Sequence, residues 1–481
     1  MLMQADPSLT RSRRLDRRAG LQAYEIEDRE DPGVTSFAGL PLAIEAYAAL
    51  GLDEVARDHV RAKTRNRGVA DAEWARLFVI LHFAGGEHVS DLDALLKDAG
   101  LRRMWPLLDK INERRAYDFL YRFEDGLEAT PGKAVIRPEC PALQGLGRMR
   151  DHLVDRVQRL HPVKVATLDA DASIHEANKR EALWTYDKVR GYQPYIITWA
   201  EQNLIVRDQF RDGNVGAGYA TLPEIQAAFA SLPSGVEKRL FRSDSACYEH
   251  KIMRWLDREG IEFGISADMS SQLRAACREL PDEAWKPLTK RDKRGRVIET
   301  DRQWAEVVFV PDDPTAKEGD RPYRYIAIRR PQQRDLFDPS VEAWTYHAIV
   351  SNRKSEGDGD AIILWQRQRC GTVEASHSVL KNDTGARVLP SKSFGANAAW
   401  YRFAVIAANL KVAIGLALPE EWRALRLSTW RFRLVRLAGR VVDHARRLRL
   451  ILGRGCTEVA KLLRDARRFL RERVATLSAS P

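Results

Sequence analysis

The chain has 481 residues, of which 44% are hydrophobic and 30% charged, and its formal net charge is +11. This length accommodates about two to four domains with sizeable hydrophobic cores. No stretch approaches the roughly 20 apolar residues that a membrane helix needs, and no apolar signal-peptide core follows the basic start. We therefore expect a soluble, cytoplasmic protein with no membrane partner.

The first third of the chain is predicted to be helical after a short leader. Residues 1–35 are polar, basic at first and then mixed in charge, which favours a disordered leader. Residues 36–160 carry apolar residues at helical spacing, as in FAGLPLAIEAYAALGLDEVARDHVR. We expect a helical N-terminal domain here and assign DNA binding to it, although no helix-turn-helix signature can be named.

Residues 161–284 alternate between strand and helix patterns. Three apolar runs in succession read as strands: VKVATLDA, YQPYIITWA and NLIVRDQF. Helices and strands then alternate through LPEIQAAFASLP, EKRLFRSD, YEHKIMRWLDREG, IEFGISA and SSQLRAACREL. The predicted order β-β-β-α-β-α-β-α is a mixed α/β sheet in which a meander precedes the crossovers.

Three further segments complete the predicted organisation. Residues 285–360 contain runs with the alternation of a small antiparallel sheet, which predicts a β-rich insertion domain. Residues 361–415 return to helical spacing and would complete the α/β core. Residues 416–481 form an Arg-rich C-terminal segment.

Almost all of the net positive charge lies in this C-terminal segment. From Arg423 to Arg473 there are sixteen Lys or Arg residues and four acids. One localised basic segment is typical of a protein that binds DNA or RNA, and a solvated helical face is the alternative. The cysteines show no C-x-x-C pair, which indicates a reducing compartment and no structural zinc site: Cys140, Cys247, Cys277, Cys370 and Cys456.

Acidic residues follow two of the predicted strands. Asp169 and Asp171 end the first strand and share one face, because side chains alternate along a strand. Asp244 ends the fourth strand, and Glu374 lies near the start of a later helix. Paired carboxylates need either a cation or solvent exposure to offset their repulsion. Two divalent metals held by acidic residues can promote phosphodiester cleavage, and Mg²⁺ suits oxygen ligands.

These motifs resemble those of the DDE transposases of bacterial insertion sequences. The pieces that carry the resemblance are LDADAS, RSDSACY and EASHSVLK, and in the last one Glu374 and Lys381 keep a Glu-x(6)-Lys spacing. The resemblance covers residues 160–415 and implies an RNase H-like core with a β-strand insertion domain before the catalytic glutamate. In that core the first and fourth strands are neighbours, so the acidic segments would converge.

The resemblance implies a catalytic and metal-binding triad of Asp171, Asp244 and Glu374. Asp171 is preferred to Asp169 because Ala172 and Ser173 follow it in place of the family's x-Thr. Asp169 is then an auxiliary residue, with a solvent-exposed neighbour as the alternative. The alternatives for the triad are two solvated strand ends and an ordinary acid in the first turn of a helix.

Four residues near the triad have expected roles or depart from the family pattern. Lys381 would contact a DNA phosphate, and Tyr248 would position the substrate near Asp244. The family often has an arginine four residues before the glutamate, where this chain has Cys370. Arg369 stands one residue away and would take its place as an auxiliary, DNA-contacting residue.

Other residues are weaker candidates for contacts with DNA. Arg242, Arg211 and the C-terminal arginines could bind phosphates. Trp304 and Trp344, in the predicted insertion, could stack on a flipped base, with a place in the core as the alternative. His377 has the helical spacing of a metal ligand relative to Glu374, but Mg²⁺ prefers oxygen.

The function that follows from the resemblance is that of a DNA transposase. It would bind the terminal inverted repeats of its element and catalyse cleavage and strand transfer with two Mg²⁺ ions, for which Mn²⁺ could substitute. The expected partners are double-stranded DNA, as element ends and target, and a second copy of the chain in a homodimer on DNA, with no small-molecule cofactor. An RNase H-like nuclease without strand transfer and a non-catalytic DNA-binding relic remain the alternatives.

Overall fold

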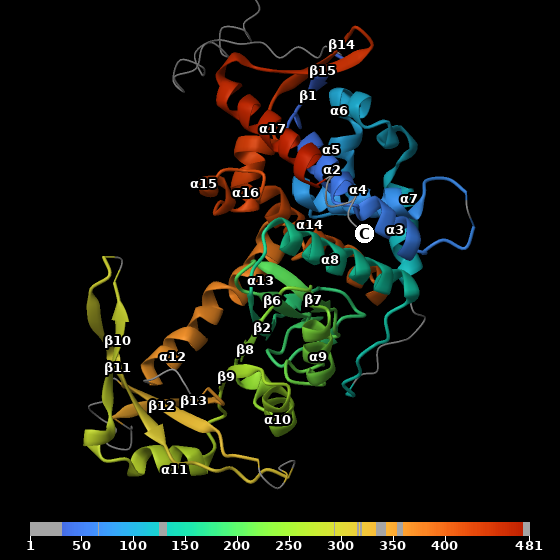
Figure 1. Ribbon diagram of the computed structural model, residues 1–481. Coiled ribbons are helices and arrows are strands. Elements are labelled where there is room, and N and C mark those ends of the chain that lie inside the picture. Colours follow the sequence, from blue (N-terminus) through green and yellow to red (C-terminus); the bar gives the residue numbers. More distant parts are fainter. Residues whose placement is uncertain are drawn as a thin grey trace, which may run out of the picture.

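The protein is mixed α/β, with a helical part next to a part built on one large sheet (Figure 1). The computed structural model describes residues 31–65, 67–124, 132–292, 294–314, 317, 320–332, 343–353 and 359–474. Most of the predicted leader, residues 1–30, lies outside the described residues. Its last part is not a free leader, because β1 (Val34–Thr35) pairs with a strand from the C-terminal segment. Among the described helices, none is long and apolar enough to cross a membrane.

The large sheet has nine strands in the order β10-β11-β12-β13-β9-β8-β2-β6-β7. Five of them come from the predicted core: β2 (Val165–Ala172), β6 (Tyr195–Trp199), β7 (Leu204–Gln209), β8 (Lys238–Ser243) and β9 (Glu262–Ser266). β6 is antiparallel to both β2 and β7, whereas β8 runs parallel to both β2 and β9. The first and fourth predicted strands, β2 and β8, are therefore neighbours, as expected.

Helices follow β7, β8 and β9 in the predicted order: α9 (Leu222–Ala230), α10 (His250–Arg258) and α11 (Ser271–Glu279). The end of α10 is set by Gly260, whose φ of 66° suits a residue without a side chain. α11 begins where the Ser270 hydroxyl accepts a hydrogen bond from the Leu273 amide at 3.1 Å. A small second sheet lies between β2 and β6 in the chain: β3 (His175–Glu176), β4 (Leu183–Trp184) and β5 (Arg190–Tyr192).

The predicted insertion forms antiparallel strands, but they are not a separate sheet. These strands are β10 (Lys286–Arg291), β11 (Val297–Val307), β12 (Arg324–Pro331) and β13 (Trp344–Ser351). β13 pairs with β9 through Ile349 and Ser266, so the four strands extend the large sheet. The pairing satisfies backbone groups that β9 would otherwise expose as an edge strand. α12 (Gly359–Arg367) packs on β10 and β11 and then leads back to the core.

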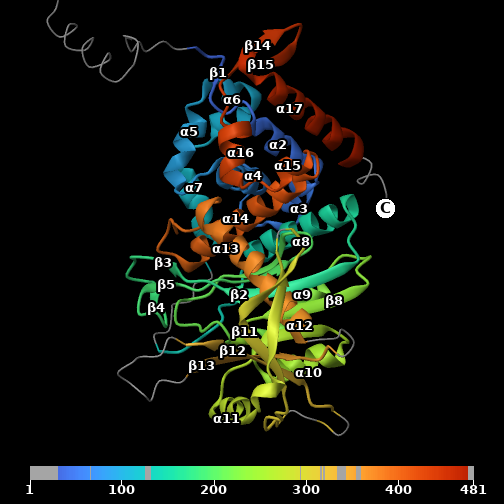
Figure 2. The same ribbon diagram turned by 90° about the vertical axis from the view of Figure 1, so that its left-hand side faces the viewer.

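The helical part surrounds one long buried helix, α14 (Phe394–Gly415), which packs on α8, α4 and β7 (Figure 2). The predicted N-terminal helices are present: α2 (Leu40–Ala49), α3 (Leu52–His59), α4 (Asp71–Ala84), α5 (Leu92–Leu96), α6 (Ala99–Met104), α7 (Glu113–Leu120) and α8 (Pro141–Leu160). Nearly every residue of α14 is buried, which explains why its sequence is apolar on all sides.

The basic C-terminal segment folds against the N-terminal helices. It contains α15 (Glu420–Arg423), α16 (Leu427–Trp430), β14 (Gly439–His444), β15 (Arg447–Leu452) and α17 (Thr457–Phe469). β14 lies between β1 and β15 in a three-stranded sheet, and Arg467 of α17 binds Glu45 of α2 at 2.6 Å. The helical part is therefore assembled from the two ends of the chain.

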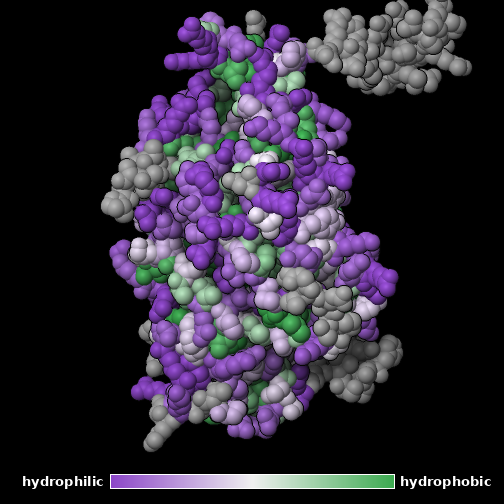
Figure 3. Space-filling model, turned by 90° about the vertical axis from the view of Figure 1, so that its right-hand side faces the viewer, coloured by the Kyte–Doolittle hydropathy of each residue, from purple (hydrophilic) through white to green (hydrophobic). Residues whose placement is uncertain are grey.

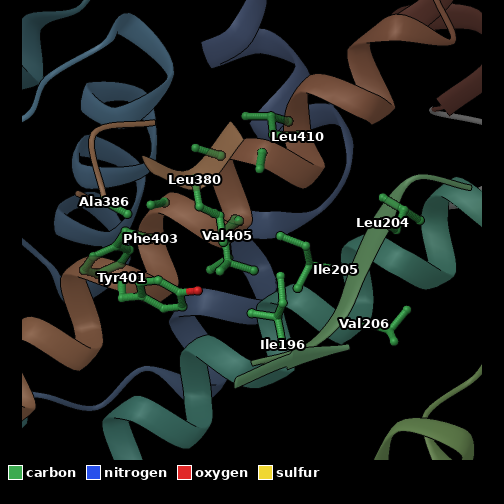
Figure 4. Close-up of a cluster of buried hydrophobic side chains, with 14 of the residues drawn as sticks. Ile196, Leu204, Ile205, Val206, Leu380, Ala386, Tyr401, Phe403, Val405 and Leu410 are labelled. Atoms are coloured by element: carbon green, nitrogen blue, oxygen red, sulfur yellow. The ribbon is translucent and has the colours of Figure 1, made fainter. Parts of the chain in front are cut away.

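A short helix, α13 (Val373–Asn382), lies between the large sheet and α14. Leu380 of α13 belongs to a buried cluster with Ile196 and Ile205 of the sheet and Val405 and Leu410 of α14 (Figure 4). Burial of such aliphatic side chains contributes about 1.5 to 3 kcal/mol each. This packing fixes α13, and with it Glu374, against β2 and β6.

Candidate active site

The three predicted acidic residues come from neighbouring elements. Asp171 lies near the end of β2, and Asp244 follows the last residue of β8. β2 and β8 run parallel with Ala170 opposite Ser243, so Asp171 and Asp244 occupy the next position on each strand. Glu374 lies in the first turn of α13, which packs on β2 and β6. The structure thus brings the acidic segments to one end of the β2 and β8 strands.

The carboxylate of Asp171 is mostly buried and interacts with the other two. Burial raises the pKa of Asp171 to about 6, and the charges of Asp244 and Glu374 add to that rise. Arg369 opposes it, with Nη1 at 3.6 Å from Asp171 Oδ2. In the described part of the chain, no three His, Cys, Asp or Glu side chains are gathered closely enough to hold a metal. The three acids therefore feel one another's charge without forming a closed metal cage.

Asp169 differs from Asp171 in having strong protein partners. It is fully buried, and Arg242 of β8 binds both of its oxygens, with Nε at 2.6 Å and Nη2 at 2.8 Å. The hydroxyl of Thr372 also donates to Asp169 Oδ2. Paired charges of this kind are tolerated in an interior because each one neutralises the other. Asp169, predicted as an auxiliary site residue, is bound by protein donors and is not exposed to solvent.

This buried contact joins the three segments that carry the acids. We call Asp169, Arg242 and Thr372 the clamp. Asp169 precedes Asp171 by two residues, Arg242 precedes Asp244 by two, and Thr372 precedes Glu374 by two. Asp169 and Arg242 are also directly opposite in the β2–β8 register. The clamp therefore aligns the three segments with one another, and each acid lies two residues further along its own segment.

Arg242 is not available to DNA in this arrangement, contrary to the prediction. Only 2% of the residue is exposed. Its Nη1 donates to the Trp365 carbonyl at 2.6 Å, and its guanidinium lies 5.4 Å from the centre of the Trp365 ring. Arg211 is buried as well, with its guanidinium over the Tyr195 ring at 4.5 Å. Both arginines serve the interior, since a buried guanidinium needs partners there.

The structure places Lys381 and Arg369 beside Asp171. Lys381 Nζ donates to Ser173 Oγ at 2.6 Å. Burial lowers the pKa of Lys381, while Asp171 and Glu176 act to raise it, so the lysine lies within the field of these carboxylates. Arg369, in the 3₁₀ turn before α13, faces Asp171, and the neighbouring Cys370 is exposed. Although Arg369 stands one residue before the family's arginine position, it still places a positive charge at the site.

Two buried histidines lie near the triad: His377 is beside Asp171, and His175 is close enough to His377 to help lower its pKa. His377 of α13 has Nε2 at 3.9 Å from Asp171 Oδ2, and burial lowers its pKa to about 3. His175 of β3 has Nδ1 at 3.0 Å from the Ala386 carbonyl, and burial also lowers its pKa to about 3. Both rings are therefore neutral near pH 7 and add no charge to the site. His175 was missed because nothing in the local sequence separates it from an ordinary core histidine.

The remaining predicted site residues either lie in the strands that extend the sheet or contact them. The Tyr248 hydroxyl is 2.8 Å from that of Tyr325 on β12, which joins the turn after Asp244 to the insertion strands. Trp304 is buried in a cluster with α12, so it has the core role that was its alternative. Trp344 is half-buried, and the Arg329 guanidinium lies 4.3 Å from the centre of its ring. None of these contacts places either tryptophan next to the triad.

The residues present suit a divalent cation of oxygen preference. Asp171, Asp244 and Glu374 supply carboxylate oxygens alone, which are the ligands that Mg²⁺ favours. Burial is the main cause of the raised pKa of Asp171, and the charges of Asp244 and Glu374 add to it, so these carboxylates repel one another. Arg369 is the one arginine with a recorded ion pair to them among the described residues. A bound cation would relieve that repulsion.

Comparison with known proteins gives a family and a distant structural likeness. The family model for the transposase DDE domain, group 1, matches residues 29–474. No curated protein sequence matches the chain. Among solved structures, a piggyBac transposase in a synaptic complex with hairpin DNA aligns with a TM-score of 0.42 and 10% identity, over 93% of this chain and 84% of that chain.

Proposed function

The chain belongs to the family of transposase DDE domains, group 1, and on that premise we propose that it excises and inserts its own insertion sequence. It would bind the terminal inverted repeats and catalyse both DNA cleavage and strand transfer. The order β7-β6-β2-β8-β9, with an antiparallel meander followed by parallel strands, supports an RNase H-like core. The family membership supports cleavage and joining of DNA as the chemistry.

The observation that carries the site assignment is the effect of two carboxylates on a third, mostly buried one. Burial raises the pKa of Asp171, and the charges of Asp244 and Glu374, which come from separate segments, add to that rise. Perturbed carboxylates of this kind are concentrated at functional sites. A purely structural acid would instead resemble Asp169, whose charge is matched by Arg242. We therefore assign catalysis and metal binding to the triad.

The proposed cofactor is Mg²⁺, as two ions, with Mn²⁺ as a substitute. Asp171, Asp244 and Glu374 would hold the metal through their carboxylate oxygens. When bound, it would supply the Lewis acidity that activates a water or a 3′-hydroxyl and stabilises the leaving oxygen. The chain itself contributes the fixed positions of these acids, which depend on the clamp beneath them.

Two basic side chains, Lys381 and Arg369, are proposed to orient the DNA strand at the triad. Lys381 is held at Ser173 and lies in the field of Asp171, where it would contact a phosphate beside the scissile bond. Arg369 already pairs with Asp171, and a bound metal would free it for a phosphate oxygen. Tyr248 is proposed to support this region through Tyr325, because its hydroxyl is engaged there.

Double-stranded DNA is the proposed partner, both as element ends and as target. Transposition requires two ends to be held together, so a homodimer on DNA is the proposed assembly. The charge of the C-terminal segment supports a polyanionic partner, because residues 423–473 contain sixteen basic residues and only four acids. A nuclease without strand transfer would share the triad but release cut ends.

The test is an assay with labelled element ends, target DNA and Mg²⁺. The wild type should cut the ends and join them to the target, and Asp244→Asn should bind the ends without cutting. Asp118→Asn is the matched control, because Asp118 is exposed on α7 and far from the triad in sequence. Cutting without joining would favour the nuclease, and binding without cutting by the wild type would favour the relic. Normal cutting by Asp244→Asn would refute the site.

A further inference from the structure

The hairpin of β14 and β15 has two faces of opposite character. In its register, Val441 pairs with Leu450 and Asp443 with Leu448, so these four side chains share one face. Val441 is fully buried, and Asp443 is bound by Arg103 of α6. The Val441 end of this face therefore packs against the protein, whereas Leu448, near the turn, is 45% exposed. Alternation along the strands directs the intervening residues outward.

The outward face and the turn carry most of the hairpin's charge. Three exposed arginines, Arg446, Arg447 and Arg449, have side chains that make no hydrogen bond or ion pair with any residue that the structure describes. Arg440 shares their face and contacts Asp31 at 3.3 Å. The hairpin's one acid, Asp443, lies on the other face and is already neutralised by Arg103. An uncompensated row of arginines thus faces solvent.

The turn places one of these arginines at the very tip. Ala445 and Arg446 connect the strands directly, with φ values of 48° and 62°. A two-residue turn with both φ values positive usually contains Asn-Gly, because most other residues disfavour a positive φ. The tight turn keeps the hairpin narrow, and it holds Arg446 beyond the last pair of the ladder, His444 and Arg447.

The hairpin projects from the end of the molecule opposite the large sheet. It lies at the top of Figures 1 and 2, whereas β2, β8 and α13 lie in the lower half. In Figure 3 the same end carries projecting hydrophilic side chains. α17 beside it uses one face to pack on α2, and Lys461 and Arg464 on that helix remain exposed. Exposed basic side chains are therefore present on both the hairpin and α17.

The major groove of B-DNA has the shape that such a hairpin fits. That groove is about 12 Å wide and admits a two-stranded ribbon, and its walls are lined with phosphates. The two strands of a ribbon are about 4.8 Å apart, which leaves room for side chains on both flanks. Charge on an edge strand can also serve only to prevent pairing with other chains. The experiment below separates these explanations.

Resting on the proposed function, we propose that the β14–β15 hairpin enters the major groove of duplex DNA. Arg446, Arg447 and Arg449 would then contact phosphates and base edges at a distance from the scissile bond. The hairpin would hold the element end while the triad acts on it. This assigns DNA docking to a specific element of the C-terminal segment.

The test measures binding of a short element-end duplex by Arg446→Ala/Arg447→Ala/Arg449→Ala as a function of salt. Affinity should fall at least about tenfold, and the slope of log affinity against log salt should shrink by about 2 to 3, because each phosphate contact contributes about 0.9. Guanine N7 methylation, which blocks the major groove, should interfere with wild-type binding at positions where it no longer affects the variant. The unfolding midpoint should be unchanged, since these side chains are exposed.

The matched control removes three exposed charges elsewhere, as Arg57→Ala/Lys97→Ala/Lys110→Ala, and should bind as the wild type does. Duplex RNA should compete poorly, because its major groove is too narrow for side chains to read. Equal losses in both triple variants, an unchanged methylation pattern or equal competition by RNA would each overturn the proposal. Cleavage by the wild type tests the proposed function separately, so docking can fail while transposition stands, and the reverse.

Discussion

The clamp and the triad are two layers of polar residues, two positions apart on the same three segments. In the inner layer, Asp169 is fully buried and Arg242 binds both of its oxygens. In the outer layer, Asp171 is mostly buried and its nearest cation is 3.6 Å away. Burial raises the pKa of Asp171 to about 6, and two further acids add to that rise. The outer layer is also less buried, since Asp244 is half-buried and Glu374 is exposed. Asp169 and Asp171, the two aspartates of β2, differ most in their supply of positive charge.

That difference separates a structural acid from a site prepared for a cation. A buried ion pair contributes little net stability, because desolvation of both charges offsets their attraction. Removing one partner is costly, however, since the other is left unpaired in the interior. The inner layer should therefore respond to mutation through folding. Mutation of the outer layer should instead lower the cleavage rate, because its negative charges are not fully matched by positive ones.

The largest expected effect is the loss of stability in Asp169→Asn. Arg242 would remain buried without a counter-charge, so we expect the free energy of unfolding to fall by about 3 to 5 kcal/mol. The measurement is the denaturant midpoint, with Asp118→Asn on the surface of α7 as the charge-matched control. An unchanged midpoint would show that the clamp does not hold the segments together.

A double variant sharpens the same comparison. Asp169→Leu/Arg242→Met removes both charges, so it should recover most of the stability lost in Asp169→Asn. DNA cleavage should stay low in the double variant, because the hydrogen bond from Thr372 to Asp169 is lost with the carboxylate. Full recovery of cleavage along with stability would mean that the clamp acts on folding alone.

The second effect is on the outer layer and concerns catalysis. Asp171→Asn and Glu374→Gln should each reduce the cleavage rate by about 1,000-fold, or about 4 kcal/mol, because metal binding supplies several kcal/mol to such reactions. Their unfolding midpoints should be no lower than that of the wild type, since each removes a repelling charge. A loss of stability comparable to that of Asp169→Asn would erase the distinction between the layers.

Much of the core could be predicted from local patterns. Apolar runs with Gly and Ser at their ends fixed the order of β2, β6, β7, β8 and β9, and the adjacency of β2 and β8 followed from the family resemblance. The attachment of β13 to β9 was not predictable, because it depends on pairing between segments about 85 residues apart, which leaves no local signal. The strands β14 and β15 had a signal, since Arg447, Leu448, Arg449 and Leu450 alternate with period two.

The clamp also had a signal that the charge pattern alone did not reveal. Asp169 and Arg242 stand at the same offset before Asp171 and Asp244, and neighbouring parallel strands place equal offsets side by side. That symmetry would have predicted a salt bridge in place of an exposed carboxylate and a DNA-binding arginine. His175 and His377 offer no such regularity, because the nearness of His377 to Asp171 and of His175 to His377 arises only in the folded chain.

The third effect is a pH dependence that the outer layer should show without metal. Asp171 keeps its proton up to pH about 6 when folded, whereas an unfolded aspartate loses it near 3.9. The folded state therefore binds more protons between these values, and its stability falls as pH rises through that window, by about 2 to 3 kcal/mol in total. Asp171→Asn should lack this fall. The measurement is the unfolding midpoint in chelator at pH values below and above the window.

The smallest effect tests whether a cation supplies what the outer layer lacks. A ligand at ten times its Kd stabilises the folded state by about 1.4 kcal/mol when it binds the unfolded chain negligibly. Mg²⁺ at that level should raise the Tm of the wild type near pH 7, and the rise should shrink below pH 6, where Asp171 holds its proton. Asp244→Asn and Glu374→Gln should show little of the rise, while Asp118→Asn should keep all of it. An equal rise in Tm in every variant would show that Mg²⁺ binds away from the triad.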